Sequence, residues 1–349
     1  MWAAALGGAV VAGAAAGFGA ERKVVRSRRV IAEPTDETFS ELHADRTYSV
    51  DVGSGVSLHV EEVGSASAPV AMVFLHGFTQ HLDCWHFQRT GLADVAGSQV
   101  RLAFIDQRGH GRSGRGSDES CTIEQLGVDM RHVLDEVVPS GDVILVGHSM
   151  GGMTIMALAE TAPELFLDRV VGVALISTSA GQMAHVTFGL PSVLGKAATW
   201  VRPKVWAAVG RRAAQLERLR SDGSDIAHAA TQRIGFGRAD GVSPSMVEYV
   251  SSMFDQSSIA TMAAFMPAFL THDRHAALAT MQDIEALVLV GDHDLLTPVE
   301  HSRAIARSLP HARLVVLPGA GHMVIMERAE LVNLHLRALL SRCRMRSAA

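Results

Sequence analysis

A serine flanked by glycines, in Gly147-His148-Ser149-Met150-Gly151, is the side chain of this sequence best suited to act as a nucleophile. The apolar, β-branched run 142–146 before it predicts a buried strand, and the run 153–159 after it predicts a helix. A serine at a sharp strand-to-helix turn stands clear of the backbone, above the first amides of the helix. The pentapeptide is short and also arises by chance, so the prediction depends on the rest of the site.

Acyl transfer at this serine requires two backbone N–H groups directed at the developing oxyanion. The residue after the nucleophile, Met150, is expected to supply one, and a loop after an earlier strand the other. The apolar run 73–75 leads into His76-Gly77-Phe78, so Phe78 is the expected second donor. An ordinary turn at the end of a strand is the alternative interpretation of His76-Gly77.

Two aspartates follow the apolar strand predicted over residues 287–290, and a carboxylate there can orient a catalytic histidine. We favour Asp294 for this role and expect Asp292 to stabilise the turn locally. The strand that ends at residues 176–179 carries no acid, which also favours Asp294. The alternative is that both aspartates serve only the turn.

His322 supplies the remaining group, a general base for the serine proton. It follows the strand predicted over residues 314–317, in a loop of small residues. The chain has 17 histidines, so the position of this one matters more than its type. Nucleophile, acid and base then occur in the order Ser149, Asp294, His322, which is typical of the α/β-hydrolase arrangement and differs from chymotrypsin and subtilisin.

The elements that must position these residues alternate along the chain. Strands are predicted over residues 46–52, 56–63, 70–76, 100–105, 143–147, 170–177, 287–290 and 314–317. Helices are predicted over residues 82–95 and 123–138, the latter capped by Thr122, then from Pro298 and over about 328–343. This alternation predicts a mostly parallel sheet, whose ligand site lies beyond the carboxyl ends of its strands. Phe78, Ser149, Asp294 and His322 all follow strand ends.

With these residues the chain resembles the α/β-hydrolase superfamily, and within it the capped esterases related to pimeloyl-carrier-protein methyl ester carboxylesterase. The run Asp106–Ser113 matches the D-x-R-G-x-G-x-S loop frequent in that superfamily, where it is a structural loop beside the site. The resemblance covers roughly residues 46–345. It implies an α/β fold with an eight-stranded, mostly parallel sheet and helices on both faces, built from residues 46–180 and 282–349. It also implies a helical cap inserted over residues 181–281.

The alternation of strands and helices stops within residues 181–281, where aromatic residues are scattered through helical-looking segments. By resemblance, such a cap lines the acyl or leaving-group pocket. Substrate contacts are therefore expected at His76, Gly77, His148, Trp206, Phe265 and Phe269. Packing within the cap is the alternative for each aromatic residue there. Few charges converge in this segment, so we expect an apolar ester as the small-molecule substrate.

Length and composition fit one large α/β domain with an inserted subdomain: 349 residues, of which 48% are hydrophobic and 19% charged. A net charge of −5 offers no electrostatic case for a nucleic-acid partner. Three widely spaced cysteines, Cys84, Cys121 and Cys343, predict no disulfide framework. We expect no metal and no organic cofactor, because serine acyl transfer requires neither.

Residues 1–29 differ from the rest of the chain. Residues 1–20 contain fourteen Ala or Gly and no charged residue, and residues 21–29 carry five basic residues. Three interpretations stay open: a membrane helix whose basic flank keeps the catalytic domain in the cytoplasm, a helical arm, and an export signal. An export signal normally has positive charge before its apolar stretch, and this segment has none there. We favour a cytoplasmic protein with membrane contact through residues 1–29, and interpret residues 30–45 as a linker.

The sequence thus predicts a serine hydrolase that forms an acyl-enzyme. His322 takes the proton of Ser149, Asp294 orients His322, and the amides of Phe78 and Met150 bind the oxyanion. A cofactor-free haloperoxidase or perhydrolase and a carbon–carbon bond hydrolase are alternatives that use the same triad. A ligand receptor with slow turnover is the alternative from another class.

Overall fold

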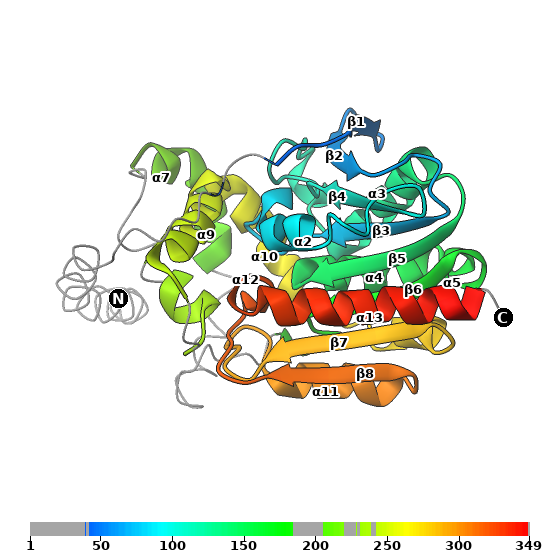
Figure 1. Ribbon diagram of the computed structural model, residues 1–349. Helices are drawn as coiled ribbons and strands as arrows, with labels where there is room; N and C mark the ends of the chain where they lie inside the picture. Colours follow the sequence, from blue (N-terminus) through cyan, green and yellow to red (C-terminus); the bar gives the residue numbers. More distant parts are fainter. Residues whose placement is uncertain are drawn as a thin grey trace.

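A computed structural model describes residues 39, 42–183, 205–219, 228, 231–238 and 242–347 (Figure 1). Its eight strands are β1 (Arg46–Asp51), β2 (Ser57–Val63), β3 (Val70–Leu75), β4 (Val100–Ile105), β5 (Asp142–His148), β6 (Val170–Ile176), β7 (Glu285–Gly291) and β8 (Ala312–Leu317). They form one sheet in the order β1-β2-β4-β3-β5-β6-β7-β8. Only β2 pairs antiparallel with its neighbours, and β3 to β8 are parallel. The predicted mostly parallel, eight-stranded sheet is confirmed.

Alternation along the strands divides the core into two layers, because successive side chains of a strand point to opposite faces of the sheet. On β3, Val73 and Leu75 join one buried cluster, whereas Met72 and Phe74 join the other. Every residue of β3 is buried, as expected for a central strand of a parallel sheet covered on both faces.

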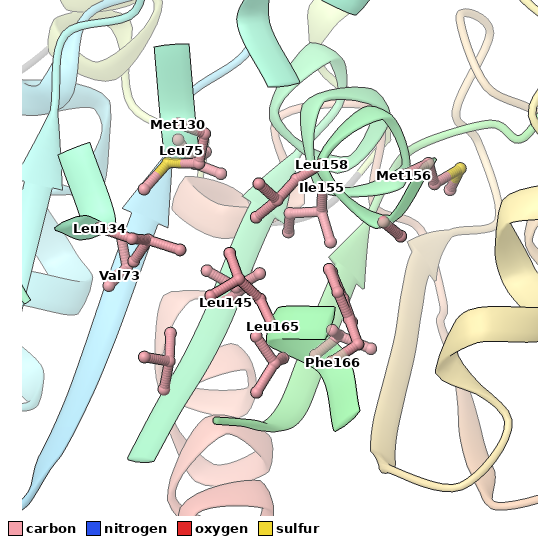
Figure 2. Close-up of a cluster of buried hydrophobic side chains, with 14 of the residues drawn as sticks. Val73, Leu75, Met130, Leu134, Leu145, Ile155, Met156, Leu158, Leu165 and Phe166 are labelled. Carbon is pink, nitrogen blue, oxygen red and sulfur yellow. The ribbon is translucent and has the colours of Figure 1, made fainter. Parts of the chain in front are cut away.

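The first layer contains α3 (Ile123–Val137), α4 (Met150–Thr161), α5 (Pro163–Asp168) and α11 (Val299–Ser308). Figure 2 shows how Met130 and Leu134 of α3 and Leu158 of α4 meet Val73 and Leu145 of the sheet. The N-terminus of α3 is capped as predicted, because the side chain of Thr122 accepts a hydrogen bond from the backbone N–H of Gln125.

The second layer contains α2 (His86–Gly91), α12 (Val324–Glu327) and the long α13 (Ala329–Ser347), which crosses the sheet in Figure 1. The helix predicted over residues 82–95 is instead a 3-10 turn, η1 (Leu82–Trp85), followed by the short α2. The backbone N–H of Leu82 donates to Asp106 Oδ1 at 2.7 Å. A side chain from the end of β4 thus holds the start of η1, and this contact is not visible in local sequence.

Between β6 and β7 the described residues form α7 (Ala213–Leu219), the π-helical turn η4 (Thr231–Gly235), α9 (Pro244–Gln256) and α10 (Ile259–Leu270), then the 3-10 turn η5 (Ala276–Met281). In Figure 1, α7 and α9 lie beyond the carboxyl ends of the strands. The two ends of this insertion meet, because Gly181 forms a β-bridge with Asp273 and Arg274 N donates to Ala180 O at 2.6 Å.

Residues 1–29 lie outside the described part of the chain, as do most of the predicted linker and the segments around Trp200. Among the residues that the structure describes, none of the helices combines the length and the apolar character needed to cross a membrane.

Candidate active site

Ser149 occupies the turn between β5 and α4 with φ 53° and ψ −114°. This backbone conformation is strained for a residue with a side chain, at a cost of roughly 1–3 kcal/mol, and persists only where its surroundings enforce it. Ser149 N donates to Ile176 O at 2.9 Å, and Ser149 O accepts from Thr178 Oγ1 at 2.7 Å. The last residue of β6 and the segment that follows it therefore hold the backbone on both sides of Ser149.

The glycines around Ser149 allow the turn to pack against the sheet. A Cβ atom on Gly151 would lie 2.1 Å from Leu75 O, and one on Gly147 would lie 2.5 Å from the carbonyl carbon of Gly151. Both distances are far below van der Waals contact. Glycine is thus required at these two positions because α4 starts directly against the end of β3.

Phe78 and Met150, the predicted oxyanion donors, lie on the loops that leave β3 and β5. Leu75 and Gly147 are register partners, so the two loops begin at the same level of the sheet. In the part of the chain that the structure describes, the backbone N–H groups of Phe78 and Met150 have no hydrogen-bond acceptor. Both groups are therefore available as donors at the sheet edge where Ser149 lies.

His76 fixes the loop that carries Phe78. Gln107 N donates to His76 Nε2 at 2.9 Å, so Nε2 is unprotonated, and Nδ1–H donates to Gly77 O at 2.7 Å. Burial, reinforced by neighbouring His110, holds the pKa of His76 well below its ordinary value. His76 is fully buried, and the structure places it behind the loop rather than on an open surface.

His148, also fully buried, connects the nucleophile turn to the loop of His322. Its Nε2–H donates to His322 O at 2.9 Å, and its Nδ1 lies 3.2 Å from Gln80 Oε1. Burial and the proximity of His322 lower the pKa of His148 to about 3, so the ring is neutral. The residue before Ser149 thus contacts the backbone of the predicted base.

Asp294 and His322 form a buried pair: His322 Nδ1 lies 3.0 Å from Asp294 Oδ1 and 2.9 Å from Oδ2. The turn also hydrogen-bonds Asp294, through Leu296 N and Thr297 N to Oδ1 and through Thr297 Oγ1 to Oδ2. Burial acts to raise the pKa of Asp294, but His322 and the donors of Thr297 outweigh it and the pKa is lowered. An ionised Asp294 is suited to fix one tautomer of His322 and to stabilise its cation.

Asp292 lies at the surface of the same turn. Its Oδ1 accepts from Gly319 N at 2.7 Å and pairs with His293 Nδ1 at 2.7 Å. Of the two aspartates that follow β7, Asp294 is therefore the one that the structure brings to His322.

Aromatic side chains of the insertion approach Phe78. The ring centroid of Phe269 lies 4.9 Å from that of Phe78, and that of Phe265 lies 6.1 Å away. Phe265 is completely buried, whereas Phe269 and Trp206 are partly exposed. Within the described residues no ring contact joins Trp206 to this cluster.

Two residues of the site were not predicted. Gln80 accepts from Gly77 N at 3.0 Å and donates to Met323 Sδ at 3.1 Å, which joins the Phe78 loop to the His322 loop. Thr297 donates to Asp294, and its spacing of three residues is typical of an aspartate-stabilised turn. That spacing is a usable signal for Thr297, whereas Gln80 shows none in the sequence.

The run Asp106–Ser113 forms a loop after β4 whose side chains hold neighbouring backbone in place. Asp106 accepts from Leu82 N at 2.7 Å and from Arg112 N at 2.9 Å, and Arg108 forms two hydrogen bonds of 2.7 Å with Asp129. These contacts fit a structural loop. Among the described residues, no cluster of three or more His, Cys, Asp or Glu side chains is arranged to bind a metal ion.

Comparisons with known proteins agree with this fold. The sequence profile of the family described as alpha/beta hydrolase fold matches residues 70–329. A dihydrolipoyllysine-residue acetyltransferase component of an acetoin cleaving system from Pseudomonas putida is 28% identical over 83% of this chain and 68% of its own length. A pimeloyl-[acyl-carrier protein] methyl ester esterase from Nitrosomonas europaea is 26% identical over 76% of this chain and 92% of its own length. A solved esterase from Thermogutta terrifontis has a TM-score of 0.65, with 23% identity over 85% of this chain and 99% of that one.

Proposed function

The chain belongs to the alpha/beta hydrolase fold family, and from this premise we propose that it hydrolyses carboxylic esters with Ser149 as the nucleophile. The observation that carries the proposal is the buried Asp294–His322 pair, which lies at the same sheet edge as the strained turn of Ser149. The backbone of His322 is also hydrogen-bonded to His148, the neighbour of Ser149.

The proposed reaction has two steps. His322 Nε2 accepts the proton of Ser149 Oγ while Oγ attacks the ester carbonyl, and the same proton then goes to the departing alcohol. A water molecule next gives a proton to His322 and attacks the acyl-enzyme; the bond between the acyl carbon and Ser149 Oγ then breaks, His322 returns the proton to Oγ, and the acid is released. The N–H groups of Phe78 and Met150 stabilise the oxyanion in both steps. Asp294 holds the proton on His322 Nδ1, so that Nε2 is the free acceptor.

We propose an ester with an apolar acyl or alcohol group. Phe78 and Phe269 put partly exposed aromatic surface beside the oxyanion donors. The methyl ester esterase among the relatives supports an ester substrate. On this proposal, residues 181–281 act as a cap whose aromatic side chains contact the substrate, and the core supplies the reacting groups.

Hydrolysis of p-nitrophenyl esters from acetyl to long acyl chains tests the proposal directly. Ser149→Ala should reduce turnover by on the order of 10⁴–10⁶-fold, as expected for the nucleophile of a serine triad. The acyl-chain length with the highest kcat/KM would then indicate the length of the acyl pocket.

Ser177→Ala is the matched control. Ser177 is fully buried at the end of the adjacent strand β6, has φ 44°, and its Oγ has no hydrogen-bond partner among the described residues. Its replacement should leave turnover unchanged. Equal turnover in the wild type and Ser149→Ala would refute the proposed nucleophile, and no turnover in either would favour a hydrolase with a narrow substrate range or a receptor.

A further inference from the structure

Glu327, the last residue of α12, joins two segments that are far apart in sequence. Its Oε1 accepts a hydrogen bond from Gly321 N at 2.8 Å, and its Oε2 accepts one from Gly237 N at 2.9 Å. Gly321 directly precedes His322, whereas Gly237 follows η4 in the insertion between β6 and β7. One buried carboxylate thus holds the insertion and the loop of the proposed base together.

The two segments are also in direct backbone contact. Met323 N donates to Gly235 O at 2.8 Å. A Cβ atom on Gly237 would lie 2.3 Å from Gly319 O and 2.5 Å from Gly321 N. Residues 235–237 therefore lie against residues 319–323 with no space for a side chain between them, and the carboxylate of Glu327 closes this contact from one side.

Burial of the Glu327 carboxylate costs free energy of folding. The residue is 7% exposed, and burial of an ionised group is unfavourable unless it is fully paired and hydrogen-bonded. Two N–H donors satisfy it in part. A neutral amide of the same shape has one acceptor oxygen, so it could accept only one of the two N–H groups and would direct its own N–H at the other.

We propose that Glu327 is a positioning residue: its carboxylate couples the inserted segment to the loop of His322 and so sets where the proposed base stands relative to Ser149. This inference rests on the proposed function for its catalytic part. The coupling of the two segments is independent of the reaction, and the experiments below separate the two.

The charges around Glu327 make the coupling sensitive to pH. Burial raises the pKa of Glu327 to about 7; the N–H groups of Gly237 and Gly321 and the charge of Arg328 act in the opposite direction, while Asp294 acts with burial. Protonation would replace one acceptor oxygen by a hydroxyl, which accepts hydrogen bonds less well.

Of the other charged groups on the elements around Glu327, Glu330 in the first turn of α13 is exposed. Arg233 and Arg238 of the insertion are exposed. On η1 and α2, Asp83 pairs with His81 and Arg89 pairs with Glu61. Because the pKa of Glu327 is raised in the closed contact, protonation below pH 7 favours that contact, and ionisation above pH 7 makes it easier to open.

Kinetics across pH form the first test. Glu327→Gln should lower kcat by on the order of 10–100-fold above pH 7 with little change in KM, because a displaced base weakens only the transition state. The acid limb of log kcat/KM should also differ between the two proteins, because Glu327 titrates near pH 7 in the wild type and the variant has no titrating group at this position.

Asp292→Asn is the matched control for these profiles. Asp292 accepts from Gly319 N in the same loop but is exposed and hydrogen-bonds no residue of the insertion among those described. It should retain the kcat and the acid limb of the wild type. A purely structural role of Glu327 would reduce the amount of folded enzyme and leave both quantities of the folded fraction unchanged.

Amide hydrogen exchange tests the coupling without the reaction. In the wild type, the protection of Gly237 and Gly321 should rise as pH is lowered from 8 to 6, because Glu327 binds its proton more tightly in the closed contact than in an open one, while Gly319, held by Asp292, keeps its protection. Glu327→Gln should exchange faster at Gly237 or Gly321 throughout this range.

If Glu327→Gln does not fold, amide hydrogen exchange of the wild type across pH is the test of the coupling. Constant protection at Gly237 and Gly321 would overturn the coupling, and a variant with wild-type kcat and acid limb would overturn the positioning role. If Ser149→Ala keeps full turnover but the exchange behaves as expected, the proposed function fails and the coupling stands.

Discussion

At the scale of single residues, each member of the proposed triad is held in place by hydrogen bonds to residues outside the triad. Asp294 is held by Leu296 N and by both donors of Thr297. His322 is held through its carbonyl by His148. Ser149 is held on both sides of its backbone by the last residue of β6 and the segment that follows it. Such preorganisation is what a site requires if its groups must not rearrange during the reaction.

Asp294→Asn tests the role of the carboxylate. An amide would favour the wrong tautomer of His322, so kcat should fall by on the order of 10⁴-fold with the fold intact. The measurement is kcat for the best p-nitrophenyl ester, with circular dichroism to confirm folding. Asp292→Asn should lose almost nothing, and an equal loss in the two variants would show that the acid has been misassigned.

Glu327 predicts a second effect, on stability. Its pKa is raised from 4.5 to about 7, so the folded protein binds the proton more tightly than the unfolded chain. This contribution to stability is fully present below the unfolded pKa and is lost as pH rises through about 7. Between pH 5 and pH 8, the free energy of unfolding of the wild type should fall relative to Glu327→Gln by roughly 2–3 kcal/mol.

Urea unfolding of both proteins at pH 5, 6, 7 and 8 measures this difference. Parallel curves for the two proteins across that range would show that Glu327 has an ordinary pKa and does not titrate there.

At the scale of elements, the turn between β5 and α4 depends on close approach to β3. Gly151→Ala would place a methyl group 2.1 Å from Leu75 O, so the start of α4 must move. We expect a loss of roughly 1–3 kcal/mol in unfolding free energy. Activity should fall as well, because Met150 and Ser149 move with α4.

Gly97→Ala is the control for that substitution, since a Cβ atom there meets nothing within 4 Å. It should keep the stability and activity of the wild type. Equal stability of the two variants in chemical denaturation would mean that the turn has more room than the structure shows.

The positions of the strands, and the candidate site residues that follow strand ends, were predictable because both depend on local sequence patterns. Apolar runs such as 70–75 predict buried strands, and the chemistry follows their ends. The support around the site was not predictable, because it depends on contacts between distant positions. Gln80 and Met323 are 243 residues apart, and η1 is held by Asp106. For the insertion, the sequence predicted only helices. Phe265 was expected to contact substrate, and in the structure it is part of a buried hydrophobic cluster.

At the scale of the whole molecule, the two ends of the insertion meet where they join the sheet domain. Gly181 and Asp273 pair at its base. Next to them the guanidinium of Arg274 forms ion pairs with Glu124 of α3 and Glu160 of α4. Arg274 is buried, so its position ties the end of the insertion to the helices that cover the sheet.

Arg274→Met should therefore destabilise the protein by roughly 1–3 kcal/mol, since charge-assisted hydrogen bonds of a buried group are lost. Urea unfolding measures the change. Arg303→Met removes an exposed pair with Glu300 and should change stability by less than about 0.5 kcal/mol. Equal effects would indicate that the connection is not stabilised by Arg274.

Residues 1–29 carry a separate prediction, made from sequence alone. If they contact a membrane, the full chain should sediment with the membrane fraction of fractionated cells, and a chain that starts at Ile31 should stay in the supernatant. Equal distribution of the two proteins would refute membrane contact through this segment.

The pairing of Gly181 with Asp273 has a consequence for how this protein can change. Because the two ends of the insertion are held together, the chain leaves and re-enters the sheet domain at the same place whatever the length of the insertion. The entropic cost of a longer loop grows slowly, by about 0.6 kcal/mol for each doubling of its length. The insertion can therefore vary in length at little entropic cost, provided that residues 235–237 keep their contact with the loop of His322.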